Sequence, residues 1–96
     1  MTVHAIFQMQ IDTPEKLAEY RLVAAAALAR HGGAVIAASP GPSPIDPGGR
    51  LTDPPGMVAI LTFPTPEAAQ AWIADPEIKN AHALRNSAGI GQVWLL

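Results

Sequence analysis

The chain reads Ile11-Asp12-Thr13-Pro14-Glu15 and, 52 residues later, Phe63-Pro64-Thr65-Pro66-Glu67. In each copy the threonine follows an uncharged run and stands seven residues before an aromatic side chain, Tyr20 or Trp72. A threonine can cap a helix, and a proline is favoured at the first helical position because its missing N–H has no partner there. A glutamate in the first turn suits the positive end of the helix. The repeat therefore predicts two strand–helix units.

Segments without charged residues indicate where the strands lie. They predict four strands, at residues 3–11, about 34–38, 57–63 and 90–96. The first helix should span 14–31, ahead of Gly32, which suits a left-handed helix end. The second should span about 66–74, and Asp75-Pro76-Glu77 then starts a further helix.

This order, βαββαβ, indicates the fold. Two βαβ units with right-handed crossovers predict an α+β, ferredoxin-like domain over residues 1–96, a four-stranded antiparallel sheet with the helices on one face. The strand at 57–63 presents large apolar residues on both of its faces, so both need cover. We expect a second copy of the chain to cover the open face, which gives a homodimer.

Residues 39–56 join the two halves and contain six prolines and four glycines. Such a segment cannot maintain a helix or a central strand. Two interpretations stay open: an exposed, partly disordered connection, or a lid over a pocket.

Composition narrows the classes of partner. The formal charge of −2 gives no basic field for nucleic acid or for a membrane surface. The absence of cysteine excludes disulfides and thiol catalysis, and the N-terminus has no pattern of a signal peptide. No uncharged run approaches the roughly 20 residues of a membrane span. We therefore expect a cytoplasmic protein.

The motifs together resemble those of domain-of-unknown-function family 1330, in the dimeric α/β-barrel superfamily. The resemblance covers nearly the whole chain and rests on Asp12-Thr13-Pro14-Glu15 with Tyr20, His31-Gly32-Gly33, Phe63-Pro64-Thr65 leading to Ala71-Trp72, and Asp75-Pro76-Glu77 with Arg85 downstream. It implies a ferredoxin-like protomer that dimerises sheet against sheet, and no established reaction. Relatives in the wider superfamily include cofactor-independent monooxygenases, haem-degrading enzymes and small lyases or isomerases.

The chain also departs from the family pattern. Ala38-Ser39-Pro40-Gly41 stands where the family usually has Arg-Gly-Gly, so a cationic group near the cleft is missing. Ile78 replaces an aromatic residue, and the usual Glu-Gly ending is absent. These departures put shared ligand chemistry in question.

Six residues are candidates for a ligand site: His4, Tyr20, His31, Trp72, His82 and Arg85. The aromatic pair occupies equivalent positions in the two halves, either as core or with a polar atom at a pocket wall. His31 ends the first helix, where it can cap, pack or face a cleft between helix and sheet.

The remaining candidates lie on the last helix and the first strand. His82 and Arg85 are one helical turn apart and could bind an anionic or carbonyl group together; a surface salt bridge or helix cap is the alternative for Arg85. His4 and Gln8 could enter a cavity within the barrel or form hydrogen bonds at a strand edge or interface.

No pattern indicates a cofactor or a metal, because the three histidines form no His-x-x-x-His pair with a nearby carboxylate. Two functions remain open, and whether the protein is an enzyme is undecided. One is a cofactor-independent small-molecule binder or enzyme, in which a neutral histidine abstracts a proton beside a bound carbonyl. The other is a non-catalytic structural or protein-interaction domain. The cleft that this fold forms favours the first.

Overall fold

The computed structural model describes residues 2–50 and 56–96, and the predicted fold is confirmed. The elements are β1 (Val3–Ile11), α1 (Pro14–Ala29), β2 (Ala34–Ser39), β3 (Met57–Phe63), α2 (Pro66–Ala74), the short 3-10 helix η1 (Pro76–Ile78), α3 (Lys79–Ala88) and β4 (Gly89–Leu95). The bounds of β1 and β3 match the sequence prediction, whereas α1 is shorter than predicted and ends at Ala29.

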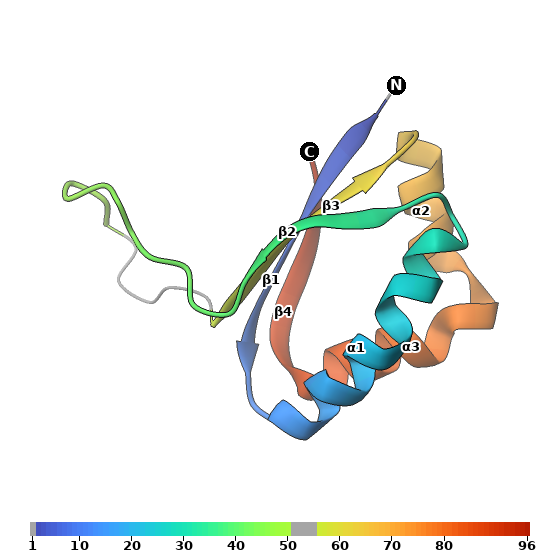
Figure 1. Ribbon diagram of the computed structural model, residues 1–96, viewed down its shortest axis with the longest axis horizontal. Helices are drawn as coiled ribbons and strands as arrows, with labels where there is room; N and C mark the ends of the chain where they lie inside the picture. The colour runs from blue at the N-terminus through green and yellow to red at the C-terminus, as the bar shows by residue number, and fades with distance from the viewer. Residues whose placement is uncertain (1, 51–55) are drawn as a thin grey trace.

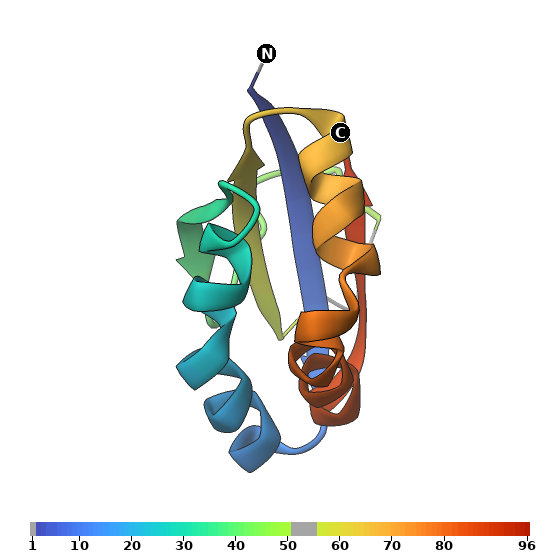
Figure 2. The ribbon, with the colours of Figure 1, turned by 90° about the vertical axis from the view of Figure 1, so that its right-hand side faces the viewer.

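One antiparallel sheet of the order β2-β3-β1-β4 forms the centre of the molecule (Figure 1). The helices cover one of its faces, with α1 lying over the β2–β3 side and α2 with α3 over the β1–β4 side (Figure 2). Both βαβ crossovers thus place their helices on the same face of the sheet. The described part of the chain leaves the other face uncovered.

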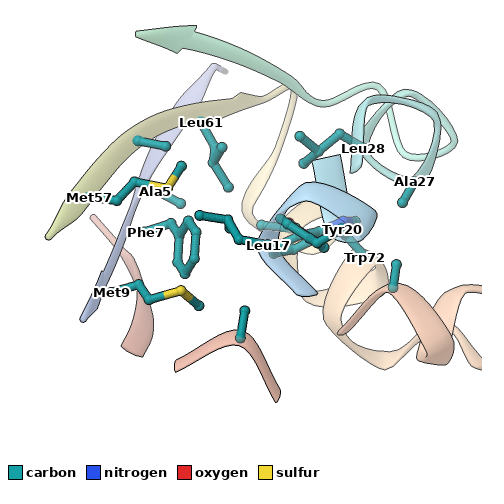
Figure 3. Packing of buried hydrophobic residues seen from close by; sticks show 14 of the residues in the cluster. Ala5, Phe7, Met9, Leu17, Tyr20, Ala27, Leu28, Met57, Leu61 and Trp72 are labelled. Atoms are coloured by element: carbon teal, nitrogen blue, oxygen red, sulfur yellow. The ribbon is translucent and has the colours of Figure 1, made fainter. Parts of the chain in front are cut away.

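The core lies between the sheet and the helices. Alternate residues of β1, namely Ala5, Phe7 and Met9, are buried and face the helices. Leu17 and Tyr20 of α1 pack over them, and the tyrosine ring meets the Phe7 ring edge-on at 6.4 Å between centroids (Figure 3). Because buried and exposed residues alternate along β1, one face of the sheet is buried under the helices.

The two helix starts differ in spite of the repeated motif. The Thr65 side chain caps α2, accepting a hydrogen bond of 3.1 Å from the backbone N–H of Ala68. Thr13 is the N-cap residue of α1, as predicted, but its side chain makes no capping hydrogen bond. Instead, the backbone N–H groups of Asp12 and Thr13 both donate to the carbonyl of Ala88, which ties the start of α1 to the end of α3.

The end of α1 follows the predicted left-handed turn. Gly32 has a φ of 72°, and its N–H donates to the carbonyl of Ala29, while the N–H of Gly33 donates to the carbonyl of Leu28. These are the two hydrogen bonds of a Schellman motif, which a glycine forms without steric cost.

The uncovered sheet face is apolar along its middle row. Strand register aligns Ala37, Ile60, Ile6 and Trp94 across the four strands, and Val58 and Ile90 lie on the same face. Trp94 is 53% exposed and Ile90 is 76% exposed. Both faces of β3 are therefore apolar, as predicted, but only one is buried within the chain.

Residues 40–50 project away from the body, on the side of the sheet opposite the helices (Figure 1). None of them lines either of the cavities described below. The segment with two open interpretations, an exposed, partly disordered connection or a lid, spans 39–56, and its part at 51–55 lies outside the described residues. No helix in the described part of the chain is both long and apolar enough to cross a membrane.

Candidate functional site

A cavity of about 460 Å³ lies between the α2–α3 layer and the helix-facing side of β1 and β4. Its lining combines apolar side chains with polar ones, of which His82, Arg85 and Asn86 come from α3 and Gln70 and Gln92 from α2 and β4. The lining residues are Ala5, Phe7, Met9, Phe63, Ala69, Gln70, Trp72, Ile73, His82, Arg85, Asn86, Gly91, Gln92, Val93 and Leu95. A second hollow, of about 370 Å³, lies between α1 and α3.

The His82 and Arg85 side chains in the lining of the large cavity are positioned by the break between α2 and η1. In a continuous helix the carbonyl of Trp72 would accept the N–H of residue 76, but Pro76 has none. The His82 ring fills the vacancy: its Nε2 lies 2.8 Å from that carbonyl oxygen. Since a carbonyl oxygen only accepts hydrogen bonds, Nε2 carries the proton.

The other ring nitrogen of His82 holds an arginine. Nη1 of Arg85 lies 2.8 Å from Nδ1 of His82, and a guanidinium can only donate. His82 is therefore neutral, with Nδ1 as acceptor. Burial lowers the pKa of His82, and the positive charge of Arg85 lowers it further, although the Trp72 carbonyl opposes both effects. Both ring nitrogens are engaged.

Arg85 is buried, with 5% of its surface exposed. Its Cζ lies 5.2 Å from the centroid of the Trp72 ring, 5.8 Å from that of Tyr20 and 5.9 Å from that of Phe7. Aromatic faces at such distances attract a cation. No ion pair joins Arg85 to a carboxylate of the described residues, so the surface salt bridge considered from the sequence does not form there.

Trp72 forms the wall between the core and the cavity. It is 2% exposed, and its ring packs against Phe63 at 5.5 Å and edge-on against His82 at 4.8 Å. Its buried Nε1 has no hydrogen-bond partner among the described residues. An unsatisfied buried donor costs about 1–3 kcal/mol, so this nitrogen is an unsatisfied donor in a residue that lines the cavity.

The other candidates are divided among three places. Tyr20 lies in the core, does not line the cavity, and contacts two residues that do, Phe7 and Arg85. His4 is exposed on the uncovered sheet face, in register with Thr62 of β3. His31 lines neither cavity. The structure thus brings together Trp72, His82 and Arg85 and separates His31 from them.

His31 belongs to a polar cluster that sequence reasoning missed. Its Nε2 lies 2.8 Å from Oδ2 of Asp75, which also accepts a hydrogen bond of 2.7 Å from Nε of Arg30. Oδ1 of Asp75 accepts the N–H of Glu77 at 2.8 Å. That backbone N–H, then His31 and Arg30, lower the pKa of Asp75 to about 2.

Among the residues that the structure places, no three side chains of His, Cys, Asp or Glu gather in a way that could hold a metal ion. The cavity lining instead includes the N–H groups of Arg85. Such groups can bind or polarise an oxygen atom of a ligand.

The arrangement is that of a ferredoxin-like α+β protein with a cavity beneath its second helical layer. The sequence profile of a family described as a domain of unknown function, DUF1330, matches residues 2–96. The chain therefore belongs to this family, as the motifs suggested. No curated protein shows significant sequence similarity to the chain.

Solved structures share the fold at low identity. A protein of unknown function from Rhodopseudomonas palustris is 20% identical, with a TM-score of 0.74 over 99% of this chain and 80% of its own. SnoaB, a cofactor-independent oxygenase from Streptomyces nogalater, is 16% identical, with a TM-score of 0.68 over 99% and 90%. A dimeric ferredoxin-like protein of unknown function from Jannaschia sp. CCS1 is 13% identical, with a TM-score of 0.69 over 100% and 98%.

Proposed function

We propose that the protein binds a small apolar or carbonyl-containing molecule in the large cavity, without a cofactor, and that it acts as a homodimer. The observation that carries this proposal is a cavity that combines apolar side chains with the buried guanidinium of Arg85. Ligand sites are commonly apolar clefts in which a few placed polar groups fix the orientation. Here Arg85 is the charged group among the polar residues of the lining.

The geometry supports a particular role for each group. A carbonyl oxygen next to Arg85 would be polarised, which favours attack on the carbonyl or loss of a neighbouring proton. His82 is unsuited to be the base that takes this proton, because both of its nitrogens are already hydrogen-bonded. His82 acts as a positioning residue that holds the guanidinium.

The fold likeness to SnoaB is compatible with such chemistry, since that protein is described as an oxygenase that needs no cofactor. The homodimer is supported by the apolar face of the sheet and by the dimeric description of two fold relatives. Dimerisation would place the two cavities on the outer, helical sides of the assembly, so each protomer would hold a complete site.

The test is native mass spectrometry of the protein purified from its source, compared with two matched variants. Ala69 of α2 lines the large cavity, and Ala81 of α3 lines the second hollow; both are buried. We expect a dimer that carries one organic molecule per protomer. Ala69→Leu should lose the molecule because the added side chain occupies the cavity, and Ala81→Leu should retain it.

Two results would contradict the proposal. One is a protein that carries no molecule and binds none from an extract of its source. The other is a molecule that remains bound at the same stoichiometry in Ala69→Leu. Thermal unfolding of both variants checks that any loss of ligand reflects the cavity and not the stability of the fold, because both substitutions overpack a buried site.

A further inference from the structure

No carboxylate of the described residues balances the charge of Arg85. Its guanidinium is buried, and the one hydrogen bond that it makes within the described residues goes to a neutral imidazole. The three aromatic rings around it attract the cation at 5.2–5.9 Å but carry no negative charge. A buried charge is costly unless an opposite charge and hydrogen bonds compensate it. The free site therefore lacks an anion.

The hydrogen-bonding capacity of the site is equally one-sided. A guanidinium has five N–H donors, and one of them is directed at His82. The indole N–H of Trp72 is a second donor without an acceptor among the described residues, although its nitrogen is itself buried. Because His82 uses its only acceptor for Arg85, the His82–Arg85 pair presents only donors to a ligand. A ligand that binds this pair must bring acceptors.

We propose that the ligand is an organic monoanion, a carboxylate carried on an apolar or aromatic body. This inference rests on the proposed function and specifies its ligand. The planar fork of an arginine matches a carboxylate with two parallel hydrogen bonds. The body then lies along Phe7, Met9 and Phe63, which are apolar residues of the lining. Arg85 is the one charged residue of the lining, so a single negative charge suits the site better than a phosphate dianion.

The test compares acids with their neutral amides, which have the same shape and keep the carbonyl group. Isothermal titration calorimetry would measure binding of 2-naphthoate against 2-naphthamide, and of octanoate against octanamide. We expect each acid that binds to bind at least tenfold more tightly than its amide. Arg85→Met should abolish this preference, and Arg85→Lys should retain part of it, because the charge stays and the fork is lost.

Arg21→Met is the matched control, since Arg21 is exposed on α1 and lines neither cavity. It should leave every affinity unchanged. The acid–amide comparison in the unmodified protein needs no variant, so it decides the proposal even if Arg85→Met fails to fold.

The possible results distinguish the proposal of an anionic ligand from the proposed small-molecule site itself. If the amides bind as tightly as the acids, the anion proposal is overturned and the proposed small-molecule site stands. If neither acids nor amides bind, both are overturned. If the acids bind more tightly but Arg85→Met and Arg85→Lys keep the full preference, the charge recognition lies elsewhere and the assignment to Arg85 is overturned.

Discussion

A single proline determines how His82 and Arg85 are placed in the cavity lining. Pro76 deprives the Trp72 carbonyl of its helical donor, His82 supplies the missing N–H, and the tautomer so fixed directs Nδ1 at Arg85. Each step follows from which groups can donate and which can accept. The pair of His82 and Arg85 was identifiable from its spacing on one helix face, whereas the role of the proline required knowing where α2 ends.

The two capping threonines allow a matched comparison at the scale of single residues. Thr65→Ala should lower the free energy of unfolding by about 1 kcal/mol, because the N–H of Ala68 loses its acceptor. Thr13→Ala should cost only a few tenths of that, since the Thr13 side chain makes no capping hydrogen bond. Urea unfolding of the two variants measures both values. Equal losses, or a larger loss at Thr13, would refute the distinction.

The comparison also shows what a motif can predict. Thr-Pro-Glu located both helix starts, because proline and glutamate act through the local backbone. It could not tell which threonine caps with its side chain, because at Thr13 the N–H of Lys16, which a capping side chain would bind, donates to the backbone carbonyl of Thr13. The motif is the same in both copies and does not encode this difference.

At the scale of elements, Asp75 joins three parts of the helical layer. Its carboxylate caps η1 through the N–H of Glu77 and binds Arg30 and His31, which follow α1. The end of α1 is thereby fastened to the junction between α2 and η1. Pro76 follows Asp75 directly, so the hydrogen bonds of Asp75 hold the same junction that determines the hydrogen bonding of Trp72 in the cavity lining.

The stability of the folded protein at low pH should depend on the ion pairs and hydrogen bonds of Asp75. The pKa of Asp75 falls from its ordinary 3.8 to about 2 in the folded chain. The unfolded state therefore binds the proton more readily, and the stabilisation is full above pH 3.8 and is lost as the pH falls from 3.8 to about 2.

Asp75→Asn keeps the shape of the side chain and removes its titration. Denaturant unfolding at a series of pH values should show a smaller loss of stability between pH 4 and pH 2 for this variant than for the unmodified protein. The variant should also be less stable at pH 7, where the carboxylate is charged. Parallel pH profiles for the two proteins would show that Asp75 does not carry the effect.

Elements were predicted with unequal success, for physical reasons. The bounds of β1 and β3 were recovered to the residue, because a central strand excludes charge along its whole length. The sequence prediction placed the end of α1 two residues late, because Arg30 and His31 continue the helical pattern. In the structure they follow the helix, and their side chains bind the carboxylate of Asp75. The cavity was beyond prediction, since it depends on how α2 and α3 sit over β4.

The whole molecule has one face that its own chain leaves apolar. Ile60 lies at the centre of that face, between Ala37 and Ile6 in the register. Burying an isoleucine fully contributes roughly 1.5–3 kcal/mol, so the row that includes Trp94 provides a substantial driving force for pairing two sheets.

Sedimentation velocity over a concentration series should therefore give a dimer. Ile60→Glu should shift the protein to monomer, because the charge would have to be buried between the sheets. Leu22→Glu is the control: Leu22 is 85% exposed on α1, and its replacement should leave the dimer intact. If Ile60→Glu remains a dimer and Leu22→Glu becomes a monomer, the interface lies on the helical side and not on the open sheet face.

The central position of β1 has a consequence for how the protein is made. Its partners lie far along the chain: Val3 pairs with Phe63, 60 residues away, and Ala5 pairs with Leu95, 90 residues away. During synthesis β1 is made before both of its partners, so it stays unpaired until β3 has been made and lacks its second neighbour until β4 follows. Folds with such distant pairing form slowly. An apolar strand that waits this long is exposed to aggregation, so the folding yield should depend on how well the newly made N-terminal segment is protected.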